Sequence, residues 1–433
     1  MDAVKLLLVG GGGREHALAW KLAQSPEVST LYAAPGNPGI ARHALCVPIA
    51  VDAVDELAAF AERERIDLTV VGPEAPLVAG LADRLAARGL AVFGPSAKAA
   101  AIEGSKAFAK RLMARHGIPT ARFETFNDPV AARGYCRDLD APLVVKADGL
   151  AGGKGAIVCR TLDEADDAIA ACLERRSFGP AGGTVVIEEF LRGEEASFFV
   201  VANGRDVVPL AAAQDHKTVF DGDRGPNTGG MGAYSPVARV GPGLQEQILA
   251  RIARPTIAAL GEDGAPYRGV LFIGLMLTAE GPKVVEFNCR FGDPECQAIV
   301  VRAVDDLVPL LGAAAAGSAL PTRVRFAPDA AVCVTIASGG YPGAYRTGLD
   351  ISGVDDATAK PGVYVFHAGT ARRDGRLVTA GGRVLGVTAV APDLAAAIDT
   401  AYDAIARVSF DGMHYRTDIG RRAPAGARET AGG

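Results

Sequence analysis

Hydrophobic and polar residues follow two alternating periods over the first hundred residues of the chain. An apolar run at 4–9 is followed by four glycines and then by a helical pattern at 14–22. Similar apolar runs, each followed by glycine or proline, recur at 31–34, 68–71 and 91–93, with helical patterns between them at 54–65 and 77–88. Short strands that alternate with helices predict a doubly wound parallel sheet over residues 1–101, with ligand-binding loops after the strands.

The pattern changes after residue 101. A helical stretch rich in Lys and Arg at 105–116 precedes a strand at 142–147, a glycine-rich turn at 148–155 and a strand at 156–159. Two strands joined in this way predict a β-hairpin with a flexible tip. After this hairpin the pattern predicts one helix and five strands, at 161–175, 184–188, 197–201, 208–210, 270–277 and 283–288.

A third, strand-rich region occupies 325–422. Its apolar runs predict four strands and a final helix, at 330–336, 362–368, 377–380, 383–391 and 394–406. The last residues, 423–433, are rich in Gly, Ala and Arg, and we expect them to be disordered. Three domains agree with a length of 433 residues, since domains average roughly 150 residues.

The composition excludes several classes of protein. Lys and Arg number 45 and Asp and Glu 50, a net charge of −5, whereas a dedicated nucleic-acid-binding protein shows a basic excess. No uncharged apolar run reaches the roughly 18 residues of a membrane span. The seven cysteines are odd in number and lack CxxC spacing, which argues against a disulfide scaffold or a zinc ribbon. We therefore expect a cytoplasmic protein that binds neither nucleic acid nor membrane.

The glycine run at 10–13 lies between a strand and a helix. Backbone N–H groups in such a loop can bind a phosphate. A dinucleotide site would need glycine in place of Glu15 and an acidic residue at the end of the second strand, which ends instead in Ala33-Ala34-Pro35-Gly36. The loop therefore favours a phosphate other than that of NAD, and a tight turn without a ligand remains the alternative.

The glycine-rich hairpin carries two cations. Lys146 lies on its first strand and Lys154 in its tip. A flexible cover with backbone N–H groups and two lysines can close over a triphosphate. The sequence Gly152-Gly153-Lys154-Gly155 does not match GxxxxGK[ST], so the hairpin is not a P-loop. A solvated lysine hairpin is the alternative.

Two later segments supply groups that suit a nucleotide. The segment Glu188-Glu189-Phe190-Leu191 ends a strand, where backbone groups can bind an adenine edge and an acid a few residues on can hold ribose hydroxyls. Glu286 and Asn288 are two residues apart on a predicted strand, so their side chains share a face. Such an oxygen pair beside phosphates suits Mg²⁺, although it is also compatible with an ordinary strand end.

The order of these features along the chain resembles their order in the ATP-grasp superfamily. Ten segments between about residue 4 and residue 419 are similar to those of the phosphoribosylamine–glycine ligase family: GGREHALAW, APGNPG, VGPEAPLV, EGSKAFAK, VKADGLAGGKG, EEFLRGEEASF, QDHK, GPNTGGMGAYSP, VEFNCRFGDPE and FHAGT. The segment GPNTGGMGAYSP is the most specific of them, because the wider superfamily does not share it.

The resemblance implies an α/β fold, with α+β parts, in three domains. These are an N-terminal Rossmann-like domain at 1–101, an ATP-grasp domain at 102–324 with a mobile glycine-hairpin subdomain at about 121–190, and a strand-rich domain at 325–422. It also implies ligation of glycine to 5-phosphoribosylamine with ATP, through a glycyl phosphate, in purine biosynthesis. The implied cofactors are ATP and Mg²⁺ or Mn²⁺, and we expect a monomer that acts on small molecules.

The resemblance assigns site residues to four groups. The ATP-binding group is Lys106, Lys146, Gly152, Gly153, Lys154, Glu188, Phe190, Leu191 and Glu195, and the metal ligands are Glu286 and Asn288. The phosphoribosylamine-binding group is Gly12, Gly13, Arg14, Pro35, Gly36, Asn37 and Glu74. The candidates for glycine binding and catalysis are Asp215, Lys217, Arg290 and Asp293, each of which could instead belong to an internal ion pair.

Two departures from the family pattern affect these expectations. No acidic residue occurs near Gly274-Leu275-Met276, where ATP-grasp enzymes often carry a second metal ligand, so the number of metal ions, one or two, stays open. Cys296 replaces an expected threonine, a change too small to alter the reaction. Two rivals remain: another ATP-grasp ligase of purine synthesis with a different ribonucleotide or carboxylate donor, and a nucleotide-binding protein without activity.

Overall fold

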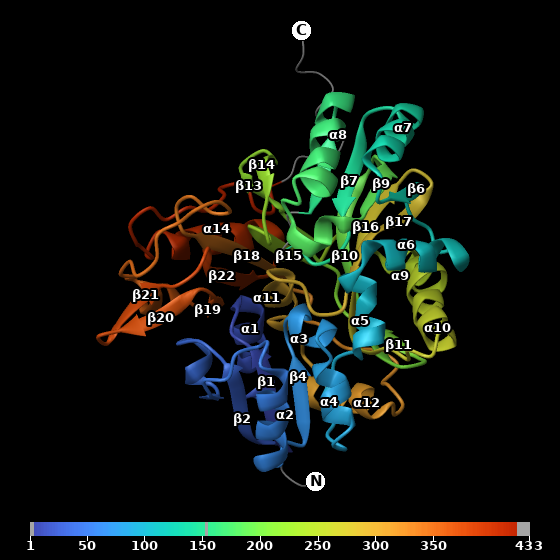
Figure 1. The fold of residues 1–433 in the computed structure, drawn as a ribbon. Coiled ribbons are helices and arrows are strands. Elements are labelled where there is room, and N and C mark those ends of the chain that lie inside the picture. The colour runs from blue at the N-terminus through green and yellow to red at the C-terminus, as the bar shows by residue number, and fades with distance from the viewer. Residues whose placement is uncertain (1–3, 152–154, 422–433) are drawn as a thin grey trace.

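The N-terminal region contains a parallel sheet, shown in blue in the computed structural model of Figure 1, which describes residues 4–151 and 155–421. The strand order is β3-β2-β1-β4-β5, with β1 (Val4–Gly10), β2 (Val28–Pro35), β3 (Leu45–Cys46), β4 (Leu68–Val71) and β5 (Val92–Phe93). The helices are α1 (Gly13–Leu22), α2 (Val54–Arg63), α3 (Glu74–Val78), α4 (Leu81–Ala86) and α5 (Ala97–Gly104). Leu7 of β1 shares a core with α2 and α4, whereas Leu8 shares another with α1, as expected of a doubly wound sheet.

A small antiparallel sheet carries the predicted hairpin. Its order is β6-β9-β7-β8, with β6 (Phe123–Phe126), β7 (Leu143–Ala147), β8 (Ala156–Cys159) and β9 (Val185–Glu189). The helices α7 (Pro129–Leu139) and α8 (Leu162–Ile169) share with it a hydrophobic core separate from the others. Gly152, Gly153 and Lys154, which were expected to bind ATP, lie outside the described residues.

The main central sheet lies beside the N-terminal sheet. Its order is β11-β10-β16-β17, with β10 (Glu194–Asn203), β11 (Val207–Pro209), β16 (Arg268–Thr278) and β17 (Gly281–Asn288). Around it lie α6 (Lys106–Arg115), α9 (Pro242–Ile248), α10 (Arg254–Glu262) and α12 (Leu307–Ala316). Phe198 and Phe199 of β10 point into the same two cores as Leu7 and Leu8, so the two sheets are held in a fixed relation.

The C-terminal region forms a five-stranded sheet that takes two strands from the middle of the chain. Its order is β12-β15-β18-β22-β19, with β12 (Gln214–Asp215), β15 (Gly232–Ser235), β18 (Ala330–Ala337), β19 (Val363–His367) and β22 (Arg383–Ala391). The helices α13 (Val354–Thr358) and α14 (Leu394–Ile405) cover it. Helix α11 (Glu295–Val300) packs between α1 and this sheet. Two hairpins project from it: β13 (Thr218–Phe220) with β14 (Arg224–Asn227), and β20 (Thr370–Arg373) with β21 (Arg376–Thr379).

Two predicted helices differ from those observed. The stretch at 77–88 contains the end of α3 and all of α4, because Gly80 adopts a left-handed conformation with φ of 87°. The helix predicted at 161–175 is α8, which continues as a π-helical segment at Ala170–Glu174. Among the described residues, no helix combines the length and apolarity needed to cross a bilayer. All seven cysteines are free thiols, and six of them are buried.

Candidate active site

The two expected metal ligands lie at the end of β17. Glu286 pairs with Gly274 of β16 and Asn288 pairs with Phe272, so both side chains leave the same face of the sheet. Val285 is an extra residue on β17, because the register shifts between Gly274 and Leu275. This bulge changes the face of the strand on which the following residues lie, and it thereby directs Glu286 and Asn288 to the site.

Three lysines surround Glu286. Lys217 Nζ lies 3.5 Å from Glu286 Oε1 and 3.4 Å from Glu195 Oε2. Lys106 Nζ donates to the carbonyl of Gly149 and Lys146 Nζ donates to that of Val285, both at 3.0 Å. Burial alone would raise the pKa of Glu286, but Lys217, Lys146 and Lys106 outweigh it and hold the pKa below its ordinary value. The carboxylate is therefore ionised at neutral pH.

The donor set at this point suits a hard divalent cation. It consists of one ionised carboxylate and one amide oxygen, the latter accepting from Arg290 Nη2 at 3.3 Å. Within residues 4–151 and 155–421, no group of three or more His, Cys, Asp and Glu could hold a metal ion. Glu286 and Asn288 therefore fit an ion that completes its shell with phosphate and water, as Mg²⁺ does.

Glu188 has a different environment from the one expected of an adenine contact. Its carboxylate is buried between two lysines, with Lys110 Nζ at 2.9 Å and Lys146 Nζ at 2.8 Å. Burial lowers the pKa of Lys110 to about 8, although Glu188 opposes the shift. The side chain of Phe190, by contrast, is exposed, and Leu191 is half-buried. The Glu188 side chain therefore neutralises and orients Lys146, which was predicted to bind phosphate.

A second cluster surrounds Arg290. Its Nε donates to Glu74 Oε2 at 2.9 Å, and its Nη2 lies 3.0 Å from Glu103 Oε1. Glu103 also accepts from the N–H of Cys289 at 2.7 Å. Burial raises the pKa of Glu103, whereas Arg290 and Arg14 keep that of Glu74 below its ordinary value despite burial. Sequence reasoning missed Glu103, although it lies in the quoted segment EGSKAFAK.

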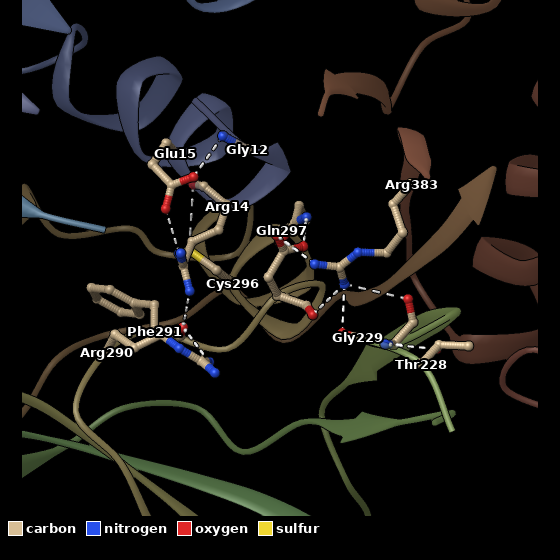
Figure 2. Close-up of polar contacts among 12 residues, drawn as sticks. Gly12, Arg14, Glu15, Thr228, Gly229, Arg290, Phe291, Cys296, Gln297 and Arg383 are labelled. Carbon is tan, nitrogen blue, oxygen red and sulfur yellow. Dashed lines mark hydrogen bonds and ion pairs between the residues drawn. The ribbon is translucent and has the colours of Figure 1, made fainter. Parts of the chain in front are cut away.

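The first glycine loop is shaped by its own carboxylate. Glu15 Oε2 accepts from the N–H of Gly12 at 2.7 Å, and Glu15 Oε1 accepts from Arg14 Nε at 2.5 Å (Figure 2). A Cβ at Gly72 would lie 2.1 Å from Glu15 Oε1, so the side chain fills the space between the ends of β1 and β4. The N–H of Gly12 is thus already used within the protein. Arg14 is buried and donates to the carbonyl of Phe291 at 3.0 Å.

The second loop is held by the side chain of Asn37. Its Nδ2 donates to the carbonyls of Gly11 and His367 at 2.9 and 2.8 Å, and its Oδ1 accepts from the N–H groups of Gly39 and Ile40. Gly36, next to Pro35, adopts a φ of 73° and carries no side chain because a Cβ would lie 2.4 Å from Cys46 Sγ. The amide of Asn37 therefore shapes the loop, and its expected contact with phosphoribosylamine stays a prediction.

The remaining two candidates occupy the turn after β17 and strand β12. Asp293 Oδ1 accepts from Gln297 Nε2 at 2.8 Å, and Asp293 Oδ2 lies 3.1 Å from Arg383 Nη2. Burial would raise the pKa of Asp293, but Arg383 and Arg14 lower it below its ordinary value. Asp215 is buried. Burial alone would lower the pKa of Lys217, but the negative charges of Glu195, Glu286 and Asp215 raise it well above its ordinary value. Asn288 joins the two clusters through its bond to Arg290.

Known proteins match the chain from end to end. The phosphoribosylamine–glycine ligase of Rhizobium meliloti is 52% identical over 428 residues, which cover 99% of this chain and 100% of the relative. The chain belongs to the phosphoribosylamine–glycine ligase family. The family member from Pseudomonas aeruginosa is 50% identical over 428 residues, covering 98% and 99% of the two chains. Family models of phosphoribosylglycinamide synthetase match in three parts: the N domain at 4–103, the ATP-grasp (A) domain at 104–296 and the C domain at 331–422.

Solved structures are also similar to the chain. The crystal structure of phosphoribosylamine–glycine ligase from Thermotoga maritima superposes with a TM-score of 0.84 at 34% identity, covering 96% of this chain and 100% of that one. The biotin carboxylase domain of the Hydrogenobacter thermophilus 2-oxoglutarate carboxylase gives a TM-score of 0.72 at 18% identity, covering 96% and 92%, which shows a shared fold. The resemblance to the family and the three-part ATP-grasp architecture predicted from the sequence are thereby confirmed.

Proposed function

We propose that this protein ligates glycine to 5-phosphoribosylamine at the expense of ATP, giving glycinamide ribonucleotide, ADP and phosphate, as in the second step of purine biosynthesis. Membership of the family supports this activity. The observation that carries it in the structure is the contact between the Glu286 cluster, with its three lysines, and the Arg290 cluster. A cluster of lysines suited to phosphates thus adjoins paired acid and arginine groups that can receive an amino acid and an amine.

The ATP side of the site follows from the charges around β17. Lys106 and Lys146 would bind the triphosphate, and Glu195 would hold the ribose while Lys217 stays between it and Glu286. Glu286 and Asn288 would hold Mg²⁺ or Mn²⁺, which supplies neutralisation of phosphate charge when bound. Lys106 and Lys146 can move toward the nucleotide, because incoming phosphates offer a stronger partner than the backbone carbonyls of Gly149 and Val285.

The reaction needs positioned charges more than a protein nucleophile. Glycine's carboxylate is a poor acyl donor until a phosphoryl group from ATP converts it to glycyl phosphate. The amine of phosphoribosylamine then attacks the acyl carbon, and phosphate leaves. Arg290 would pair with the carboxylate of glycine, while Asp215 or Asp293 would bind its ammonium group. Glu74 would bind ribose hydroxyls of the second substrate near Arg14.

The assay that tests this function measures ADP with each acid and amine in turn. We expect ADP formation that requires both glycine and phosphoribosylamine. Formation with another acid or ribonucleotide instead would favour a different ATP-grasp ligase of purine synthesis, and none in a folded preparation would overturn the proposal. We also propose that the active species is a monomer, which sedimentation under assay conditions would test.

A further inference from the structure

The turn at 228–230, within the segment most specific to the family, has no role in the reaction as proposed so far. It follows β14 and precedes β15. Thr228 donates its N–H and its hydroxyl to the carbonyl of Lys217, at 2.7 and 2.8 Å. The N–H of Gly230 donates back to Thr228 Oγ1 at 2.9 Å. The turn is therefore hydrogen-bonded to the backbone of Lys217 and helps to fix its position.

The C-terminal sheet reaches this turn through Arg383, the first residue of β22. Its Nη1 donates to the carbonyls of Gly229, Gly230 and Asp293, at 2.5, 3.4 and 2.7 Å (Figure 2). Its Nη2 pairs with the Asp293 carboxylate at 3.1 Å. One guanidinium thus connects the 228–230 turn with the turn that carries Asp293.

The two glycines of the turn lie close to neighbouring residues. A Cβ at Gly229 would lie 3.0 Å from Arg383 Cζ, and a Cβ at Gly230 would lie 2.5 Å from Pro294 Cδ. Gly230 also has a φ of 111°. Tyr341, from the loop after β18, accepts the N–H of Gly229 at 3.0 Å. The C-terminal region therefore contacts the turn through Tyr341 as well as Arg383.

We propose that Arg383 is a positioning residue of the ligase site, which fixes the Asp293 carboxylate directly and Lys217 through the 228–230 turn. The inference rests on the proposed function, since it gives the C-terminal domain a part in that reaction. A planar guanidinium can serve three carbonyls and one carboxylate at once, whereas a lysine offers a single point charge. Removal of Arg383 would leave Asp293 without its strongest cation and the turn without its cross-link.

The test compares Arg383→Met and Arg383→Lys in the full chain with Arg407→Met, an exposed arginine after α14 in the same domain. We expect kcat to fall about 10- to 100-fold in Arg383→Met and less in Arg383→Lys, and Arg407→Met to match the wild type. The urea midpoint should stay near that of the wild type. If Arg383→Met does not fold, Arg383→Lys decides the question.

A double-variant cycle separates positioning from simple docking of two domains. If Arg383 acts largely through Asp293, the Arg383→Met change should reduce kcat by less than about threefold when Asp293→Asn is already present. Fully multiplicative losses, or single variants within about twofold of the wild type, would overturn the inference. An inactive wild type would count against the proposed function, and the same cycle would then use whichever substrate pair supports ADP formation.

Discussion

Gly274 lies directly opposite Glu286 in the β16–β17 ladder, and a Cβ at position 274 would lie 3.1 Å from Glu286 Cγ. The absence of a side chain there leaves room beside the carboxylate of Glu286, the proposed metal ligand. We predict that Gly274→Ala displaces Glu286 and raises the Mg²⁺ concentration for half-maximal ADP formation about tenfold, because a shift near one ångström is enough to disturb coordination. A Mg²⁺ titration at saturating ATP measures the effect.

A matched glycine is available as the control. Gly261 lies in α10, and a Cβ there would meet nothing within 4 Å. Gly261→Ala should leave the Mg²⁺ dependence unchanged and add helix propensity. An unaltered Mg²⁺ dependence in Gly274→Ala would show that Glu286 tolerates the crowding or does not hold the ion.

The buried triad of Lys110, Glu188 and Lys146 leads to a prediction about stability. Glu188→Gln would leave two buried ammonium groups without a carboxylate. Breaking a buried pair in this way costs about 3–5 kcal/mol, so we expect the free energy of unfolding to fall by that amount. Urea denaturation followed by circular dichroism measures the change.

A surface ion pair provides the comparison for this triad. Glu280 lies 2.7 Å from Lys283 but is 76% exposed, so Glu280→Gln should lower the free energy of unfolding far less than Glu188→Gln. If Glu188→Gln were as mild as Glu280→Gln, the triad would contribute little to folding. Its purpose would then be limited to the placement of Lys146.

The elements that sequence reasoning found are those with a local signal. Strand, glycine turn and helix at 4–22 can be recognised from neighbours in the chain, and so can the pair Glu286 and Asn288, because alternate residues of one strand share a face. The short strands β12 and β15 were missed because two to four residues carry no measurable period. Their place in the C-terminal sheet depends on the pairing of β15 with β18, about a hundred residues later, and of β12 with β15.

The missed site residues share the same cause. Glu103 and Arg383 reach the site through partners far away in sequence, among them Arg290 and Asp293. Glu103 does lie three residues before Lys106, in the segment EGSKAFAK, whereas no motif near Arg383 marks that residue as functional. Glu188 was expected to frame adenine, and its observed ion pair depends on Lys110 of a separate helix, which no local pattern could indicate.

A substitution of Asn37 tests whether its loop binds phosphoribosylamine. Its amide makes four bonds to backbone, two as donor and two as acceptor. We predict that Asn37→Ala raises KM for phosphoribosylamine about tenfold while KM for ATP stays within twofold, because the loop belongs to the N-terminal sheet and not to β17. Asn37→Asp, which keeps the acceptors and loses the donors, should lie between. Equal changes in both KM values would assign the loop a general structural role.

Two buried histidines join the N-terminal region to the C-terminal sheet. His16 Nδ1 accepts the backbone N–H of His367 at 2.7 Å, which requires an unprotonated nitrogen. Burial, assisted by Arg42 and Arg372, lowers the pKa of His367 to about 4, and burial with His367 and His43 lowers that of His16 well below normal. Both rings are therefore neutral in the folded protein, whereas in the unfolded chain they bind protons below about pH 6.5.

The sign of the pH effect follows from this difference. The unfolded state takes up more protons than the folded state between about pH 6.5 and 4, so the contribution to stability is complete above pH 6.5 and is lost as the pH falls toward 4. We predict that the wild type loses about 2 kcal/mol more than His367→Asn between pH 7 and 5, as measured by urea unfolding. His116→Asn, at the end of α6, controls for removal of an imidazole elsewhere. Equal losses of unfolding free energy in the wild type and His367→Asn would mean that protonation of His367 does not affect stability in this pH range.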